Sequence, residues 1–154
     1  MVTATRSAEL EEFAREGRRR FGAGDLQWFG ETTAQGEVGS FGTAAEEQVR
    51  GRDAVLALME EIVPATGDVG SSGSEADDEP EDEIEAYEAG DTGWIVTHGR
   101  FTLDDGSSVG NRVVNVVVRD PDGGGWKSVL VVSQILVANE LLEPGSPLLT
   151  PAER

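Results

Sequence analysis

The sequence contains no cysteine and a single histidine, His98, among its 154 residues. A chain without cysteine cannot form a disulfide, a thiolate metal site or a cysteine nucleophile, and nothing in it indicates an oxidising compartment. A single histidine also excludes a zinc site that needs two histidines. We therefore expect no metal site and no cofactor.

Basic residues are scarce. There are 12 Lys and Arg against 30 Asp and Glu, which gives a formal net charge of −18, and Lys127 is the only lysine. No Lys or Arg occurs between Arg52 and Arg100. Phosphate binding depends on clustered Lys and Arg, so this balance argues against nucleic acid and against a membrane as partners. The acidic excess fits either adaptation to high salt or a coding bias combined with one acidic loop.

Long apolar runs are also missing. The longest have the length of a strand and are too short to span a bilayer, and the first six residues lack the apolar core of a signal peptide. We therefore expect a soluble, cytoplasmic protein. With 154 residues, of which 38% are hydrophobic, the chain has the size of a single domain over residues 1–154 and enough core to fold without crosslinks.

The second half of the chain consists of β-branched runs separated by short turns that contain glycine. These runs predict strands over 84–88, 94–103, 109–119 and 126–137. The turn at Asp105-Gly106 is of the type that joins antiparallel neighbours. We predict an antiparallel meander, which must cover at least one of its two faces.

The first half of the chain is predicted to be mostly helical. Ser7 can cap a helix that extends to Phe21, with acids in its first turn and arginines at its end, as the helix dipole favours. Asp25 can cap a second, shorter helix, and a third is expected to open at 51–53 and to stop at Pro64. Residues 33–51 are expected to form a small hairpin, 66–82 a mobile acidic loop, and 143–154 a flexible tail.

These elements predict an α+β fold in which three N-terminal helices cover one face of a curved antiparallel sheet. Short motifs within them resemble a known family, and they are Gly24-Asp25-Leu26, the segment 50–55, the segment 85–94, Trp126-Lys127 and the segment 138–140. In their order and spacing these motifs resemble the nuclear transport factor 2-like (NTF2-like) superfamily, and most closely its SnoaL-like branch, over about residues 7–142.

The resemblance implies a cone-shaped α+β barrel with a pocket between the first helix and the concave sheet, usually in a homodimer. Members of the superfamily include isomerases, cyclases, dehydratases and epoxide hydrolases, together with binding domains that have no activity. The fold therefore does not determine the function.

Polar side chains within the apolar strands are the candidates for a functional site, because a buried polar group needs a hydrogen-bond partner. His98 is suited to proton transfer near neutral pH, but the favoured interpretation is a hydrogen-bonded residue of the sheet or of an interface. The residues that we expect to line a pocket are Phe13, Trp28, Phe29, Trp94, Asn115, Val132 and Gln134.

The related enzymes commonly carry a catalytic Asp or His inside the cone, and many have a histidine and a serine two residues apart on the closing strand. The corresponding positions here are Val132 and Gln134, which argues against catalysis. We therefore interpret the chain as a SnoaL-like homodimer, associated through its sheet face, that binds a small apolar molecule.

Two other interpretations remain at this point. One is an isomerase, cyclase or dehydratase that uses His98 or an acid in the pocket as its general base, with Asn115 and Gln134 orienting the substrate. The other is a structural dimerisation module whose sheet face buries Val114, Val116, Val129 and Val131.

Overall fold

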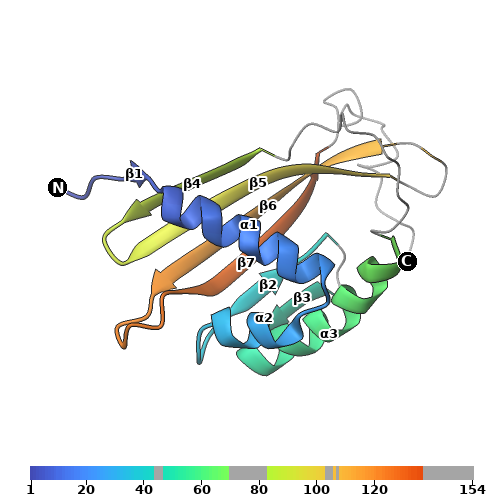
Figure 1. Cartoon of the computed structure of the whole chain (residues 1–154), viewed down its shortest axis with the longest axis horizontal. Helices are drawn as coiled ribbons and strands as arrows, with labels where there is room; N and C mark the ends of the chain where they lie inside the picture. The colour runs from blue at the N-terminus through green and yellow to red at the C-terminus, as the bar shows by residue number, and fades with distance from the viewer. Residues whose placement is uncertain (44–46, 70–82, 103–105, 107, 137–154) are drawn as a thin grey trace, which may run out of the picture.

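The computed structural model describes residues 1–43, 47–69, 83–102, 106 and 108–136. Their helices and strands form one layer of helices against a curved sheet (Figure 1). The helices are α1 (Ala8–Gly22), α2 (Leu26–Thr32) and α3 (Arg52–Val69). The strands are β1 (Thr5–Arg6), β2 (Gly39–Phe41), β3 (Gln48–Arg50), β4 (Ile84–Ala89), β5 (Thr92–Thr102), β6 (Ser108–Arg119) and β7 (Trp126–Leu136).

The sheet has the strand order β1-β4-β5-β6-β7-β2-β3. The predicted meander β4–β7 is confirmed, and every neighbouring pair within it is antiparallel. The sheet as a whole is mixed, because β2 pairs in parallel with β7. The expectation of a purely antiparallel sheet is therefore corrected at this one pair, where the predicted β2–β3 hairpin joins the edge of the meander. No helix among the described residues is long and apolar enough to cross a membrane.

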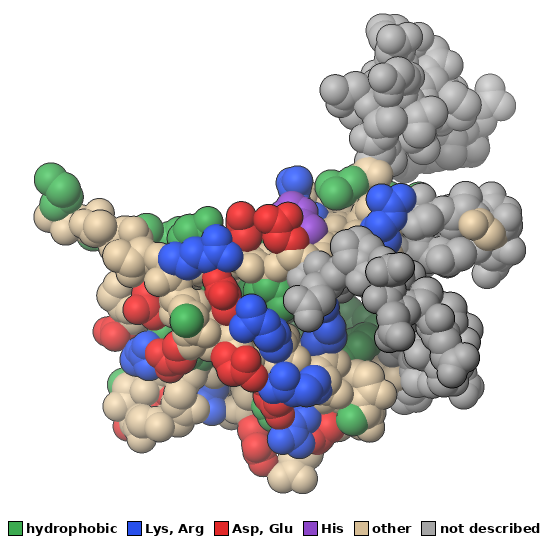
Figure 2. Space-filling model, turned by 45° about the horizontal axis from the view of Figure 1, so that its top comes forward, with side chains coloured by type: hydrophobic (Ala, Val, Ile, Leu, Met, Phe, Trp, Pro, Cys, Tyr) green, Lys and Arg blue, Asp and Glu red, His purple; other side chains and the backbone are tan. Residues whose placement is uncertain are grey.

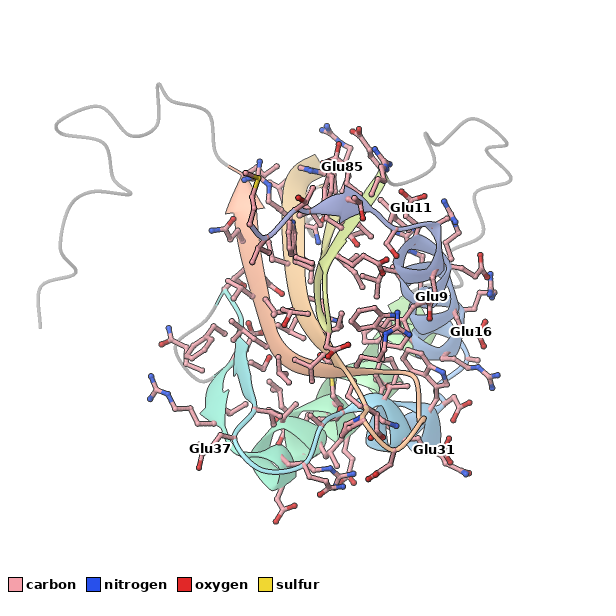
Figure 3. All side chains as sticks on the ribbon, turned by 90° about the vertical axis from the view of Figure 1, so that its left-hand side faces the viewer. Glu9, Glu11, Glu16, Glu31, Glu37 and Glu85 are labelled. Atoms are coloured by element: carbon pink, nitrogen blue, oxygen red, sulfur yellow. The ribbon has the colours of Figure 1, made fainter. Side chains whose placement is uncertain are left out.

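Helix α1 lies across one face of the sheet, and an edge-on view shows it beside the curved strands (Figure 3). The predicted cap Ser7 accepts a hydrogen bond from the N–H of Leu10 and donates one to Glu88 of β4 at 3.0 Å. This places Leu10, which is fully buried, in the main core against Ile95 and Val117. We call the sheet face toward α1 the inner face and the opposite one the outer face.

The predicted end of the third helix is wrong. Helix α3 continues past Pro64 to Val69, so residues 66–69 belong to it and not to the acidic loop. Proline removes one hydrogen bond from a helix interior, yet its fixed φ is compatible with helical geometry. Val55 and Val63 are both buried, and this packing stabilises the helix up to the proline. The remainder of the predicted loop, 70–82, and the tail, 143–154, lie outside the described residues.

A β-bulge in β7 reverses the faces to which its side chains point, so the alternation before the bulge differs from the alternation after it. Val116 pairs with Leu130 and Val117 pairs with Ser128, so Val129 is an extra residue on β7. Side chains alternate between the faces of a strand, and an extra residue shifts that alternation by one. Trp126 and Ser128 therefore lie on the inner face, whereas Leu130 and every second residue after it lie on the outer face.

Candidate functional site

The candidate site is a cavity between α3, the β2–β3 hairpin and the inner face of the sheet. Its volume is about 330 Å³, within the range of small-molecule pockets. A shallower, more open hollow of about 560 Å³ adjoins it and shares four of its lining residues. The cavity is lined by Ser40, Gly42, Thr43, Glu47, Leu58, Ile62, Asn111, Ser133 and Gln134.

Helix α3 supplies the apolar wall of this cavity. Gly51, with a φ of +89°, makes the turn from β3 into α3, and its N–H donates to the carbonyl oxygen of Val38 at 2.8 Å. The turn positions the helix so that Leu58 and Ile62, four residues apart, lie one above the other on one face. The sequence periodicity predicts such an apolar face, but it does not tell a core contact from a cavity wall.

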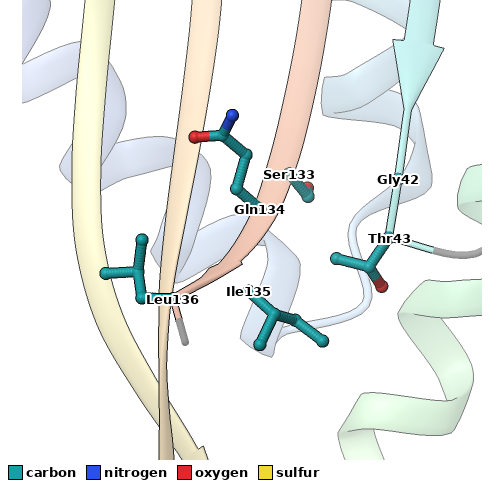
Figure 4. A pocket seen from close by; sticks show the side chains of 6 residues that line it. All are labelled: Gly42, Thr43, Ser133, Gln134, Ile135 and Leu136. Carbon is teal, nitrogen blue, oxygen red and sulfur yellow. The ribbon is translucent and has the colours of Figure 1, made fainter. Parts of the chain in front are cut away.

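The sheet supplies the polar wall. Asn111 of β6 and Ser133 of β7 lie on the inner face, and Figure 4 shows Ser133 and Ile135 directed to one side of β7 with Gln134 and Leu136 on the other. The Oδ1 atom of Asn111 is buried and has no hydrogen-bond partner within the described structure. An unpaired buried acceptor costs about 1–3 kcal/mol, and a ligand that donates to it recovers that energy.

Asn115 lies on the inner face as well, further along β6 than Asn111. Its Oδ1 accepts a hydrogen bond from the hydroxyl of Ser128 at 2.6 Å, so this amide oxygen already has a partner. Asn115 is not among the residues that line either hollow. The two asparagines of β6 therefore differ. Asn115 is hydrogen-bonded within the sheet, whereas Asn111 borders the cavity.

Glu47, which immediately precedes β3, is the one ionisable side chain among the described residues that line the cavity. Its carboxylate lies against Gly42, where any larger residue would collide with it. The backbone N–H of Gly42 donates to the carbonyl oxygen of Glu47 at 3.2 Å and closes the end of the hairpin. The sequence analysis missed Glu47, Asn111, Leu58 and Ile62, since these residues are brought together only by the pairing of β2 with β7.

His98 lies on the outer face and does not line either hollow. It pairs across the sheet with Arg112, which in turn pairs with Gln134. Figure 2 shows this single histidine at the molecular surface beside acidic side chains. Among the described residues that line the cavity, Glu47 is therefore the one candidate for a proton acceptor.

Trp94 and Val132, which the sequence analysis placed in a pocket, also lie on the outer face. The Trp94 ring stacks on that of Tyr87 with centroids 5.7 Å apart. Val132 is opposite Val114 in the outer row of valines. The sequence analysis placed Val132 by its correspondence with the closing strand of related proteins, and the bulge at Val129, which reverses the alternation after it, moves Val132 to the outer face. Gln134 does border the cavity, although its side chain extends to the outer side of β7.

The three remaining predicted pocket residues form an aromatic cluster between α1 and α2. The ring of Trp28 lies 5.4 Å from that of Phe13 and 5.0 Å from that of Phe29, measured between centroids. Gly17 leaves room for the indole, since a Cβ at this position would lie 3.1 Å from it. Phe13, Trp28 and Phe29 thus join two helices and do not line the cavity.

No group of three or more His, Asp or Glu residues in the described part of the chain is arranged to hold a metal ion. The charged groups that are perturbed lie elsewhere, around α1. The Arg119 guanidinium donates hydrogen bonds to Glu9 and lowers the pKa of that carboxyl below its usual value. The backbone N–H of Trp28, helped by Arg20, lowers the pKa of Asp25, the cap of α2. These groups stabilise the helices and are remote from the cavity.

Comparison with known proteins found similarity at the level of structure. No family model and no curated protein matches the sequence. A cystatin-like fold protein from Burkholderia xenovorans LB400 superimposes with a TM-score of 0.63 at 17% identity, over 90% of this chain and 99% of the other. An NTF2-like protein of unknown function from Pseudomonas putida KT2440 has a TM-score of 0.60 at 18% identity, over 96% and 100%.

A third similar structure is described as a candidate ketosteroid isomerase, from Parabacteroides distasonis ATCC 8503. It has a TM-score of 0.51 at 16% identity and covers 80% of this chain and 85% of its own. At such identities the likeness concerns the fold alone. The resemblance found in the sequence motifs is thereby confirmed for the architecture, and the chain has the cystatin-like α+β fold of NTF2-like proteins.

Proposed function

We propose that the protein is a SnoaL-like binding domain that holds a small, mainly apolar molecule in the cavity between α3 and the inner face of the sheet. One observation carries this proposal. The cavity has an apolar wall, Leu58 and Ile62, opposite a wall with few polar groups, of which Asn111 has a buried oxygen without a partner. Ligand sites combine such apolar surface with a small number of convergent polar groups.

The distribution of ionisable groups supports binding over catalysis. General acid–base catalysis needs a titratable side chain within hydrogen-bond reach of the proton that it transfers. The cavity offers the carboxylate of Glu47 alone among its described lining residues, and His98 lies on the other face of the sheet. An isomerase or dehydratase based on His98 would need a substrate on the outer face, where the valine rows lie.

The homodimer is the second part of the proposal. The centre of the outer face consists of two uncharged rows, Trp94-Val116-Leu130 and Val96-Val114-Val132, which run across three strands. A second copy suits this surface because a two-fold contact buries the same apolar patch on both partners. Glu85 and Arg112 lie beside these rows, so the face carries both signs of charge, as a self-complementary contact requires.

The binding function is tested by filling the cavity. Nile red, a neutral dye whose fluorescence rises in apolar surroundings, is titrated into the wild type and into Leu58→Trp. The matched control is Ala57→Trp, which adds the same indole to an exposed position of α3. We expect saturable binding by the wild type and the control, and at least tenfold weaker binding by Leu58→Trp. Equal binding by all three proteins, or none by the wild type, would contradict the function and favour a purely structural module.

A further inference from the structure

The amide oxygen of Asn111 has no hydrogen-bond donor beside it in the sheet. On the inner face Asn111 lies between Gly99 of β5 and Ile135 of β7, its two cross-strand neighbours. Gly99 has no side chain and that of Ile135 is apolar, so neither side chain can donate. The Oδ1 atom is buried and accepts no hydrogen bond from the described residues. Since Asn111 lines the cavity, a donor can reach this oxygen from there.

A serine hydroxyl lies next to this acceptor on the wall of the cavity. Ser133 pairs with Val113, the inner-face residue that follows Asn111 on β6, so Ser133 is the diagonal neighbour of Asn111. Diagonal neighbours in a sheet are about 7–8 Å apart, which leaves space for a ligand atom between the two side chains. A serine hydroxyl rotates and can either donate or accept. The pair therefore offers an acceptor and an adaptable hydroxyl to a single polar group.

We propose, on the basis of the binding function above, that the ligand is a neutral apolar molecule with a hydroxyl group that donates to Asn111 Oδ1. A hydroxyl has one donor and two acceptor sites, so its oxygen can also accept from Ser133. A ketone, an ether or a carboxylate has no donor and would leave Asn111 unpaired. An ammonium would need a counter-charge on burial, and Glu47 already has an interaction of its own. The apolar body of the alcohol packs against Leu58 of α3.

The test compares two isomers, octan-1-ol and heptyl methyl ether, of which only the alcohol has an O–H donor. Each is titrated against the full chain by isothermal calorimetry at pH 7 and below its solubility limit. We expect the alcohol to bind at least about fivefold more tightly, although it gives up more hydrogen bonding with water on entering an apolar site. Equal binding, or tighter binding of the ether, overturns the inference and leaves the binding function intact. No binding by either isomer contradicts both.

Two matched variants separate ligand binding by Asn111 from a structural role. Asn111→Leu should abolish the preference for the alcohol without lowering the thermal midpoint, because the free protein loses no hydrogen bond to this oxygen. Asn115→Leu makes the same change further along the inner face and outside the cavity lining. It should retain the preference and lower the midpoint, because Ser128 loses its partner.

The outcome for Asn111→Leu decides the inference. A variant that keeps the preference for the alcohol, or that fails to fold, overturns it, since Asn111 would then act elsewhere or serve the fold alone. If Asn115→Leu does not fold, Gln27→Leu replaces it as the control, because it removes an amide from an exposed position of α2. Loss of the preference in the control as well as in Asn111→Leu also overturns the inference.

Discussion

The guanidinium of Arg119 lies over the indole of Trp126, with its Cζ 4.1 Å from the ring centroid, and its Nη2 donates to the Glu9 carboxylate at 3.1 Å. Arg119 is at the end of β6, Trp126 opens β7, and Glu9 is in the first turn of α1. One side chain therefore connects the end of the meander to the start of the helix that covers it. This contact adds to the packing of Leu10 in the core, which holds α1 on the inner face.

Replacement of Arg119 by Ala should lower the free energy of unfolding by more than the loss of an ordinary exposed ion pair does, since the cation–π contact and the ion pair are lost together. The matched control is Arg15→Ala, which removes the same charge from exposed contacts with Glu11 and Glu12 on α1 alone. The Arg15→Ala change should lower the free energy of unfolding by less, because its contacts are exposed to water. Urea denaturation of both variants measures the difference, and equal losses would refute the role of Arg119 in holding α1.

The Glu9 carboxyl makes part of the stability depend on pH. Its pKa is lower in the folded state, chiefly because of the hydrogen bond from Arg119, so it adds stability above the unfolded pKa, and this stability is lost as the pH falls through the folded pKa. The stability difference between wild type and Glu9→Gln should therefore be present at pH 7 and decrease below about pH 4. Chemical denaturation across this range checks the sign. A difference that grows toward acid would contradict it.

Gly93 is required by the approach of α1 to the sheet. A Cβ at this position would collide with Leu10 Cδ1 and lie 3.1 Å from the carbonyl oxygen of Tyr87. We expect Gly93→Ala to destabilise the fold by about 1–3 kcal/mol, the usual effect of overpacking. Gly22→Ala is the control, because nothing lies within 4 Å of a Cβ there and alanine favours a helix. Thermal denaturation should show a lower midpoint for Gly93→Ala than for the wild type, and no lower midpoint for Gly22→Ala.

The proposed dimer predicts a specific response to charge on the outer face. Val114→Arg places a cation in the centre of the valine rows and should convert the dimer into a monomer, because burial of an unpaired charge in an interface is strongly unfavourable. Gln48→Arg adds the same charge to the exposed edge strand β3 and should leave the dimer unchanged. Sedimentation velocity distinguishes these states. A monomeric wild type at micromolar concentration would rule out the outer-face dimer.

Local signals in the sequence predicted the helix caps and the strands of the meander accurately. The caps at Ser7 and Asp25 are confirmed, since both side chains accept hydrogen bonds from the first turn of their helix. The four strands of the meander begin and end within two residues of the predicted bounds where the structure describes them. Caps, turn glycines and β-branched runs act over a few residues, so a sequence window contains all the information they need.

The site could be predicted far less well. Asn115 was expected to line the pocket, but its amide oxygen has a partner in Ser128 and it is not among the residues that line either hollow. The aromatic residues Phe13 and Trp28 pack against each other between two helices. Aromatic side chains at helical spacing have the same pattern whether they fill a core or line a pocket, and the difference lies in the neighbouring elements.

The sequence by itself determined an acidic α+β chain with capped helices and a four-stranded meander, because these features follow from local propensity and from periodicity. The tertiary structure alone decided which side of the sheet each residue faces, since the extra residue at Val129 reverses the alternation in a strand that otherwise reads evenly. The tertiary structure also determined which residues line the cavity. The parallel pairing of β2 with β7 brings Glu47 to the cavity that Asn111 also lines, and these residues are far apart in the chain, where no local pattern connects them.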